Sequence, residues 1–307
     1  MGRCENLAAP MKESDRVVTR HRETFEIGTS RTRSRRDFAL LLRRIEAMAI
    51  AATEAHWARI PPDLAERLGP RVGRVADALY TLLEASDSLQ MNRVIGLGHR
   101  GRASEAGVDE IIARYRAAGI ARFSVLMSPG PQAKPIERWL LRRGFTRHSG
   151  HALLVRDLRV VLPRTTAAVK VIRATPADRA TIVRILAASF GMPASRRSWS
   201  LAAAASRETE HFLALLGATP IGVGALRVAG ELAWLGAGAT LTRWRRRGAH
   251  RAVILARLRR PRALGCRTAW VETGIPERGR PGSSRRNLLR LGFEEACLKP
   301  AFVWRVR

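Results

Sequence analysis

A run of arginines and a glycine in the C-terminal third of the sequence could bind an anion. Residues 245–250 are Arg-Arg-Arg-Gly-Ala-His, and a helix is predicted from about Gly248 to Leu264. The first backbone N–H groups of a helix have no intrahelical partner and lie at the positive end of the helix dipole. Glycine lets a diphosphate approach the backbone without a Cβ in the way, and arginines add charge and bidentate contacts. The pattern predicts a phosphate cradle, with a solvated, arginine-rich helix start as the alternative.

The elements around this cradle are predicted to alternate between strands and helices. The segment 175–178, Thr-Pro-Ala-Asp, combines an N-cap residue, a proline at the first helical position and an acid in the first turn. Apolar segments joined by tight turns at 219–220 and 229–230 predict an antiparallel meander. The full order is a strand at 169–173, helical segments within 175–206, strands at 211–216, 221–228 and 231–238, the cradle helix, a strand at 268–272, a helix at about 284–291 and a strand near 300–305.

The N-terminal half predicts a similar order. Apolar residues at helical spacing predict a helix from Asp37 to before Pro61-Pro62, and a second helical stretch over about 63–87. A strand, helix, strand, helix and strand then follow at 92–98, 108–118, 121–127, 133–143 and 151–156. The last helix of each half ends at a Gly-Phe pair, Gly144-Phe145 and Gly292-Phe293. The matching order predicts a duplicated unit, with coincidence as the alternative because a glycine helix stop is common.

These boundaries divide the 307 residues into three parts. Residues 1–36 are polar and lack periodicity, so we expect a poorly ordered arm. Residues 37–160 and 165–307 are each long enough for one domain with its own hydrophobic core.

Charge is the unusual feature of the composition. Lysine and arginine total 55 against 26 acidic residues, a formal net charge of +29. This excess is typical either of a surface that binds polyanions or of a general drift toward arginine, and we favour the drift. The protein is therefore expected to bind nucleic acid only nonspecifically, at low salt.

Several classes of protein are excluded by the sequence. Cys4, Cys266 and Cys297 are too few and too scattered for a disulfide framework, and none lies at metal-ligand spacing, so no metal is predicted. The N-terminus mixes charges without an apolar core, and the longest nearly uncharged run, 211–226, is broken by a predicted turn. We expect a cytoplasmic protein with no signal peptide and no membrane span.

Around the cradle, the sequence resembles the GNAT superfamily of N-acetyltransferases over about residues 169–306. Members carry arginine or glutamine, two residues, glycine, one residue and glycine or alanine at the turn that binds the coenzyme A pyrophosphate. Arg245, Gly248 and Ala249 align with this pattern, with His250 at its last position. Residues 238–241 resemble the strand that grips the pantetheine arm, and residues 90–155 resemble the same superfamily more weakly.

The resemblance implies an α+β fold of two GNAT-like units, each a mixed, mostly antiparallel sheet flanked by helices. It implies direct transfer of an acetyl group from acetyl-CoA to an amine of a small molecule or peptide within a ternary complex. Only the C-terminal unit is expected to bind the cofactor, because residues 98–102 do not continue into an arginine-x-x-glycine helix start. The implied cofactor-binding residues are Ala239, Thr240, Leu241, Arg245, Arg246, Arg247, Gly248, Ala249, His250 and Asn287.

The transfer also needs a base and an acid. Glu272 ends the strand after the cradle helix and is the candidate base, with a structural carboxylate among arginines as the alternative. The superfamily's tyrosine acid in the last helix is missing, because position 288 is leucine. Ser284, Cys297 or a bound water could supply the proton, or the thiolate could leave unaided.

Two other functions remain open at this point. One is an acyl-CoA-dependent transferase that acts on a small thiol or amine metabolite. The other is a non-enzymatic, basic nucleic-acid-binding protein on a GNAT scaffold, which the missing tyrosine favours and the intact stretch 238–249 opposes. In each case the N-terminal unit is expected to extend the sheet or to wall the acceptor cleft.

Overall fold

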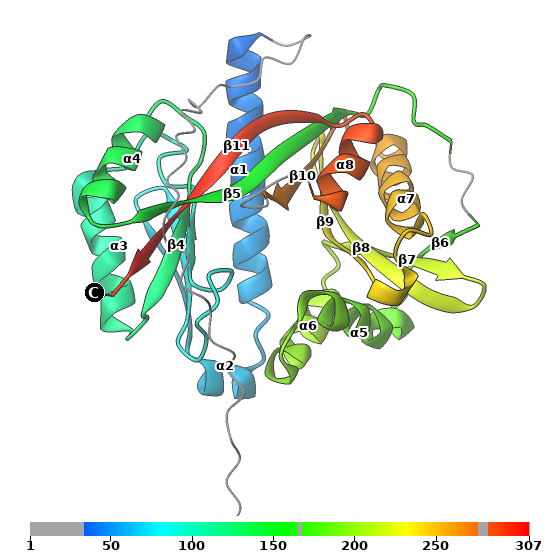
Figure 1. Ribbon diagram of the computed structural model, residues 1–307, viewed down its shortest axis with the longest axis horizontal. Helices are drawn as coiled ribbons and strands as arrows, with labels where there is room; N and C mark the ends of the chain where they lie inside the picture. The colour runs from blue at the N-terminus through cyan, green and yellow to red at the C-terminus, as the bar shows by residue number, and fades with distance from the viewer. Residues whose placement is uncertain (1–33, 165–167, 276–281, 307) are drawn as a thin grey trace, which may run out of the picture.

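The computed structural model describes residues 34–164, 168–275 and 282–306 (Figure 1). Its helices are α1 (Arg35–Trp57), α2 (Pro62–Leu68), α3 (Glu105–Ala117), α4 (Ala133–Arg142), α5 (Arg179–Phe190), α6 (Arg197–Ala204), α7 (Ala249–Ala263) and α8 (Ser283–Arg290), with short 3-10 helices η1 (Pro176–Asp178), η2 (Ala194–Arg196) and η3 (Thr242–Trp244). Its strands are β1 (Pro70–Val75), β2 (Ala78–Leu83), β3 (Arg93–Ile95), β4 (Arg122–Leu126), β5 (Thr146–Asp157), β6 (Lys170–Arg173), β7 (Glu210–Leu216), β8 (Thr219–Ala229), β9 (Leu232–Thr240), β10 (Thr268–Gly274) and β11 (Glu294–Arg305).

The strands of both halves form one continuous mixed sheet. Its order is β1-β2-β3-β4-β11-β5-β10-β9-β8-β7-β6. This order is symmetric about the β11–β5 pair. On one side lie β1 to β4 and then β11, on the other lie β7 to β10 and then β5, and β6 adds an edge strand. The predicted α+β class of two duplicated units is confirmed, with the two sheets merged into one.

The two units exchange their last strands. β11 ends the chain, yet it pairs with β4 of the N-terminal unit, and β5 pairs with β10 of the C-terminal unit. β5 and β11 pair with each other along most of their length. The sequence ranges 37–160 and 165–307 therefore share strands, and the two units are built around a common centre.

Helices cover both faces of this sheet. Along β5, Leu153 and Val155 pack with α1, whereas Ala152 and Leu154 pack in the cluster that contains α7 and α8. Because successive side chains of a strand point to opposite faces, α1 lies on one face of the central strands and α7 and α8 on the other. In Figure 1, α1 crosses the middle of the molecule between α3 and α4 on one side and α7 and α8 on the other.

The predicted helix over about 63–87 is correct only as far as Leu68 and wrong beyond it. α2 ends at Leu68, Gly69 follows with a left-handed φ of 56°, and a hairpin of β1 and β2 comes next. β2 is apolar on both faces, because Leu79 packs with Ile50 of α1 and Leu82 packs in the cluster that contains α3. A strand covered on both faces has no polar alternation, so its apolar run imitates a helix. The hairpin gives the N-terminal unit a three-strand meander that matches β7 to β9.

Two further expectations concern the N-terminal arm and the absence of a membrane span. The predicted arm, 1–36, lies outside the described residues as far as residue 33, and Ser34 caps α1 by accepting a hydrogen bond from the Asp37 amide. Among the residues that the structure describes, no helix is both long and apolar enough to cross a membrane.

Candidate active site

A gap opens in the sheet between β9 and β10. The two parallel strands pair only from Leu232 to Trp234 on β9, opposite Thr268 to Trp270 on β10. Beyond this point both strands continue, β9 to Thr240 and β10 to Gly274, without pairing to each other. The edge of β9 that faces the gap therefore leaves backbone groups available for a bound molecule.

A bulge bends β9 at the start of this gap. The register with β8 shifts between Val223 and Ala225, which inserts one extra residue into β9, and Ala237 adopts a φ of 47°. The buried Arg257 of α7 holds the bulge, because its Nη1 donates to the carbonyl oxygens of Ala225 (3.0 Å) and Gly236 (2.8 Å). Burial lowers the pKa of Arg257 to about 9, so the guanidinium remains charged at neutral pH.

The turn after β9 leads directly into the N-terminus of α7. Arg246 and Gly248 both adopt left-handed φ values, 64° and 82°. Gly248 is the N-cap residue, and no side-chain cap is found for this helix among the described residues. The first-turn amides of α7 are therefore open to an anion. This turn lies at residues 245–250, where the sequence predicts the cradle, and phosphate binding there stays a prediction.

The arginines of this turn are arranged around Trp244. Arg243 and Arg247 lie over its ring at 5.7 and 5.1 Å, while Arg245 and Arg246 are exposed. Thr240 Oγ1 and Trp244 Nε1 are buried and have no hydrogen-bond partner within the described part of the chain. Buried polar atoms normally have partners, so these two atoms fit a site that a ligand completes.

His250 and Asn287 meet beside the cradle. Asn287 Nδ2 lies 3.2 Å from His250 Nδ1, and a Cβ added to Gly238 would lie 3.4 Å from His250 Nε2. Burial, followed by the charge of Arg257, lowers the pKa of His250 to about 4. The imidazole is therefore neutral at pH 7, and it connects α7, α8 and the gap-lining part of β9.

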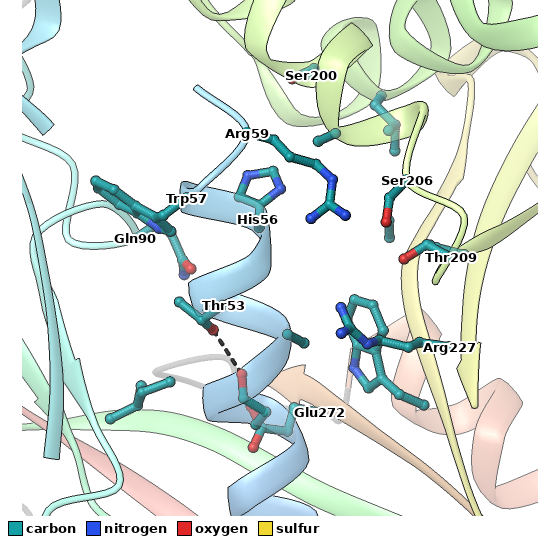
Figure 2. Close-up of a pocket in the computed structure, with 18 of the residues that line it drawn as sticks. Thr53, His56, Trp57, Arg59, Gln90, Ser200, Ser206, Thr209, Arg227 and Glu272 are labelled. Carbon is teal, nitrogen blue, oxygen red and sulfur yellow. Dashed lines mark hydrogen bonds between the residues drawn. The ribbon is translucent and has the colours of Figure 1, made fainter. Parts of the chain in front are cut away.

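A large pocket lies on the other face of the sheet, between the two units. It has a volume of about 400 Å³ and is lined by α1, by the region of α5 and α6, and by strands of both units. Figure 2 shows His56 and Thr53 on α1, Arg227 opposite them and Glu272 at the lower end. Ala237, at the bulge of β9, also lines the pocket, so the pocket and the gap between β9 and β10 meet at this residue.

An ion-pair cluster forms the floor of this pocket. Lys299 Nζ lies 2.7 Å from Glu46 Oε2 and 2.8 Å from Glu272 Oε1, and the lysine side chain is 2% exposed. Burial favours a higher pKa for Glu272, but the ion pair with Lys299 outweighs burial and the pKa of Glu272 is lowered. Glu272 Oε2 lies 3.8 Å from His151 Nδ1. The candidate base is thus in the pocket, as a carboxylate that is held ionised.

Two neutral histidines also line the pocket. Burial lowers the pKa of His56 to about 4, with further lowering by Arg196, Arg93 and Arg59. Burial also lowers the pKa of His211 on β7. Both imidazoles are therefore neutral near pH 7, and their lowered pKa values make them weaker bases than an ordinary histidine.

The N-terminal unit has a loop at the place that corresponds to the cradle, and it holds its own carboxylate. Asp77, in the β1–β2 turn, is buried and accepts hydrogen bonds from the amides of Gly98 (2.9 Å), Arg100 (2.8 Å) and Arg102 (3.3 Å). The helix that follows, α3, is capped by Ser104, whose Oγ accepts from the Gly107 amide. The anion-binding groups of this loop are therefore used inside the protein.

Comparison with known proteins decides the fold. A scan against protein-family models and a search of curated proteins gave no match. A GCN5-related N-acetyltransferase from Kribbella flavida is similar with a TM-score of 0.58 and 16% identity, over 86% of this chain and 96% of that one. A GCN5-related N-acetyltransferase from Sphaerobacter thermophilus matches with a TM-score of 0.56 and 14% identity, over 76% and 81% of the two chains. A tandem GNAT protein from the clavulanic acid biosynthesis pathway matches with a TM-score of 0.56 and 16% identity, over 75% and 79%. The chain has a tandem GNAT fold.

On this GNAT fold, the sequence-predicted cofactor residues gather at one corner. Residues 239–241 lie on β9 and just beyond it, residues 245–250 form the turn into α7, and Asn287 contacts His250 from α8. The open amides, the left-handed glycine, the arginines and the unpartnered Thr240 and Trp244 atoms fit a coenzyme with two phosphates.

The candidate acids are separated from the pocket. Ser284 lies on α8 one turn before Asn287, and it does not line the pocket. Leu288, where the superfamily pattern expects tyrosine, is buried in the core between α7 and α8. Burial raises the pKa of Cys297 to about 12, which makes this thiol a poor donor to a leaving thiolate.

Sequence reasoning missed most of the pocket. Arg59, Arg93 and Arg196 come from segments that carry no motif, and Lys299 was not singled out. These residues meet only because α1 crosses to the C-terminal unit and β11 inserts into the N-terminal one. The single available signal was the scarcity of lysine in an arginine-rich chain, which made Lys299 unusual.

Proposed function

We propose that this protein is a GNAT-type N-acetyltransferase that transfers an acetyl group from acetyl-CoA to a primary amine of a small molecule or peptide, by direct attack in a ternary complex. One observation carries the proposal: an open helix N-terminus and a splayed strand pair meet, at Ala237, a separate pocket large enough for an acceptor. The likeness to GNAT structures supports the general class of acyltransferase.

The C-terminal unit would hold acetyl-CoA. The first-turn amides of α7 and the arginines at 245–247 would bind the diphosphate, and the free edge of β9 at 239–241 would bind the pantetheine arm. The bound coenzyme supplies an activated acetyl thioester. The residues of this chain must then orient the amine, exclude water and accept one proton.

Three groups of the pocket can take part in that proton transfer. An ammonium must lose a proton before its nitrogen can attack, since its ordinary pKa is about 10. Glu272 is the candidate base, through Oε2 and a water, while Lys299 fixes Oε1. The neutral imidazoles of His56 and His211 are further acceptors, and their lowered pKa values make them weak bases too. The lowered pKa of Glu272 makes it a weak base, so we expect it chiefly to hold the ammonium in place.

Titration calorimetry with acetyl-CoA at moderate salt tests the proposal. We expect one site per chain in the wild type and loss of binding, by about 100-fold or more, in Gly248→Glu, because the new carboxylate would occupy and repel the phosphate position. Gly101→Glu is the matched control: Gly101 lies in the corresponding loop of the N-terminal unit and also has a left-handed φ, 75°. Equal binding by Gly248→Glu, or no binding by the wild type, would refute the proposal.

Titration of the same two proteins with RNA separates the nucleic-acid alternative. A basic nucleic-acid-binding protein on this scaffold would show salt-dependent RNA binding that Gly248→Glu leaves nearly unchanged, with no acetyl-CoA binding. An acyltransferase that uses a different acyl group or a thiol acceptor would bind coenzyme A through the same turn and differ only in the pocket.

A further inference from the structure

The central pocket carries an excess of cationic side chains. Five of its lining residues are basic and two are acidic, excluding the histidines. On the floor, Lys299 pairs with Glu46 and Glu272, and burial lowers the pKa of Arg93 while these two carboxylates oppose that shift. Two positive and two negative side chains therefore balance the charge of the floor. The excess positive charge of the pocket comes from Arg59, Arg196 and Arg227 at the opposite end.

These three arginines are only weakly compensated. Arg59 and Arg227 share one carboxylate, Glu208, at 4.0 and 2.7 Å, and the Glu208 side chain is 51% exposed. Arg196 has no carboxylate partner within the described residues, and its Nε is buried without a hydrogen bond. A cation that is removed from water without a partner costs free energy, which a bound anion would offset.

The arginines also lie close enough to act together. After burial, the charges of Arg196, Arg93 and Arg59 all lower the pKa of His56, so these guanidiniums lie within electrostatic range of this ring. Figure 2 shows Arg59 and Arg227 pointing into the same space from α1's end and from the C-terminal strands, with Ser206 and Thr209 beside them and Glu272 at the far end. The pocket thus has a cationic end and, near the bulge of β9, an end with two carboxylates.

We infer that the acceptor is a small amine that also bears an anionic group, a carboxylate or a phosphate, bound by Arg196, Arg59 and Arg227. Its amine would then lie toward Glu272 and Ala237, where β9 and β10 separate. Guanidinium groups bind both kinds of anion through paired N–H donors. This inference rests on the proposed function, because it names the substrate class of the same site.

Pairs of amines that differ only in the anionic group test this inference. Lysine against cadaverine and ornithine against putrescine report on the carboxylate, and glucosamine 6-phosphate against glucosamine reports on the phosphate. Release of free coenzyme A thiol would be measured with each amine at fixed ionic strength. In at least one pair, we expect the anionic member to have a kcat/KM about tenfold or more above its partner. Equal rates in all three pairs, or a preference for the amines without an anion, would overturn the inference.

A charge variant assigns any preference to the arginines. Arg196→Gln should reduce the preference about tenfold by lowering kcat/KM for the anionic amine alone. Arg197→Gln is the matched control, because Arg197 is the next residue, is exposed and does not line the pocket. Equal losses in Arg196→Gln for both members of a pair would contradict a role in anion recognition.

Thermal unfolding without acetyl-CoA distinguishes failure of this inference from failure of the proposed function. The favoured anionic amine should raise the unfolding midpoint of the wild type and of Arg197→Gln but not that of Arg196→Gln. If that shift is seen while acetyl-CoA does not bind, the anion site stands and the transferase proposal fails. If acetyl-CoA binds but no anionic amine of the three pairs shifts the midpoint or is preferred in turnover, this inference fails and the proposed function stands.

Discussion

The two strand–loop–helix turns of this sheet, β3 to α3 and β9 to α7, hold corresponding places and differ in what fills them. In the N-terminal turn, the Asp77 carboxylate accepts hydrogen bonds from three loop amides, and Ser104 caps the helix. In the C-terminal turn, Gly248 caps the helix with its backbone alone. The strands that lead into the two turns also differ in length. β3 pairs with β2 over three residues, whereas β9 has nine residues and pairs with β8 over most of them.

This contrast is the reason that we expect one cofactor site, although the chain holds two copies of the unit. Backbone amides that point into a loop need an acceptor, from the protein or from a ligand. The short β1–β2 hairpin brings Asp77 to the N-terminal loop, so that loop is complete without a ligand. The C-terminal loop has no such carboxylate among the residues described, and its arginines favour an external anion.

Removal of the internal carboxylate should have the largest effect on stability. Asp77→Ala leaves three loop amides without an acceptor, that of Gly98 buried and those of Arg100 and Arg102 partly buried, and we expect the free energy of unfolding to fall by about 4 kcal/mol. Urea denaturation would measure the loss. Asp109→Ala in α3 is the control, since this exposed carboxylate pairs with Arg143 at the surface and should cost less than about 1 kcal/mol. If Asp77→Ala left the free energy of unfolding nearly unchanged, Asp77 would not be the acceptor that the N-terminal loop requires, and the expected difference between the two turns would be refuted.

Acid should weaken the C-terminal turn through His250. Its pKa is about 4 in the folded protein against an ordinary 6.5, so between these pH values the unfolded chain binds a proton that the folded chain does not. Stability therefore falls as the pH drops from 6.5 to 4, by up to about 3 kcal/mol from this group. His250→Gln should flatten this part of a stability–pH curve. An unchanged slope in the variant would show that His250 does not titrate as its burial requires.

Loss of the bulge support should affect the C-terminal turn more than its counterpart. Arg257→Met leaves the Ala225 and Gly236 carbonyls without a donor, and we expect a loss of about 2 kcal/mol together with weaker acetyl-CoA binding. Tyr115→Phe in α3 removes one hydrogen bond to the Thr81 carbonyl and should cost about 1 kcal/mol with acetyl-CoA affinity unchanged. Denaturation and calorimetry on both variants would test the pair, and equal effects on acetyl-CoA binding would contradict the expected difference.

The smallest expected effect is at the N-terminal cap. Ser104→Ala removes the side chain that accepts from the Gly107 amide and should lower the free energy of unfolding by about 1 kcal/mol. Acetyl-CoA binding should not change, because this cap belongs to the turn that Asp77 fills. A measurable change in acetyl-CoA affinity would show that the two turns communicate.

Local patterns accounted for most of the elements and for one corner of the site. The meander at β7 to β9, the cradle helix and the Gly-Phe helix stops all follow from short-range signals of turn and helix chemistry. The residues of the cradle lie within a few positions of one another, so sequence spacing alone predicts that they act together. The β1–β2 hairpin escaped this reasoning because burial on both faces removes the alternation that marks a strand.

The sequence by itself determined the duplicated α+β units, the basic charge and the open turn at Gly248. Only the tertiary structure decided that the units exchange β5 and β11, that Asp77 fills the N-terminal loop and that Lys299 joins Glu46 to Glu272 across more than two hundred residues. The physical reason is range. Helix ends and turns depend on neighbours along the chain, whereas pairing of distant strands and of buried charges depends on which surfaces the whole fold brings together.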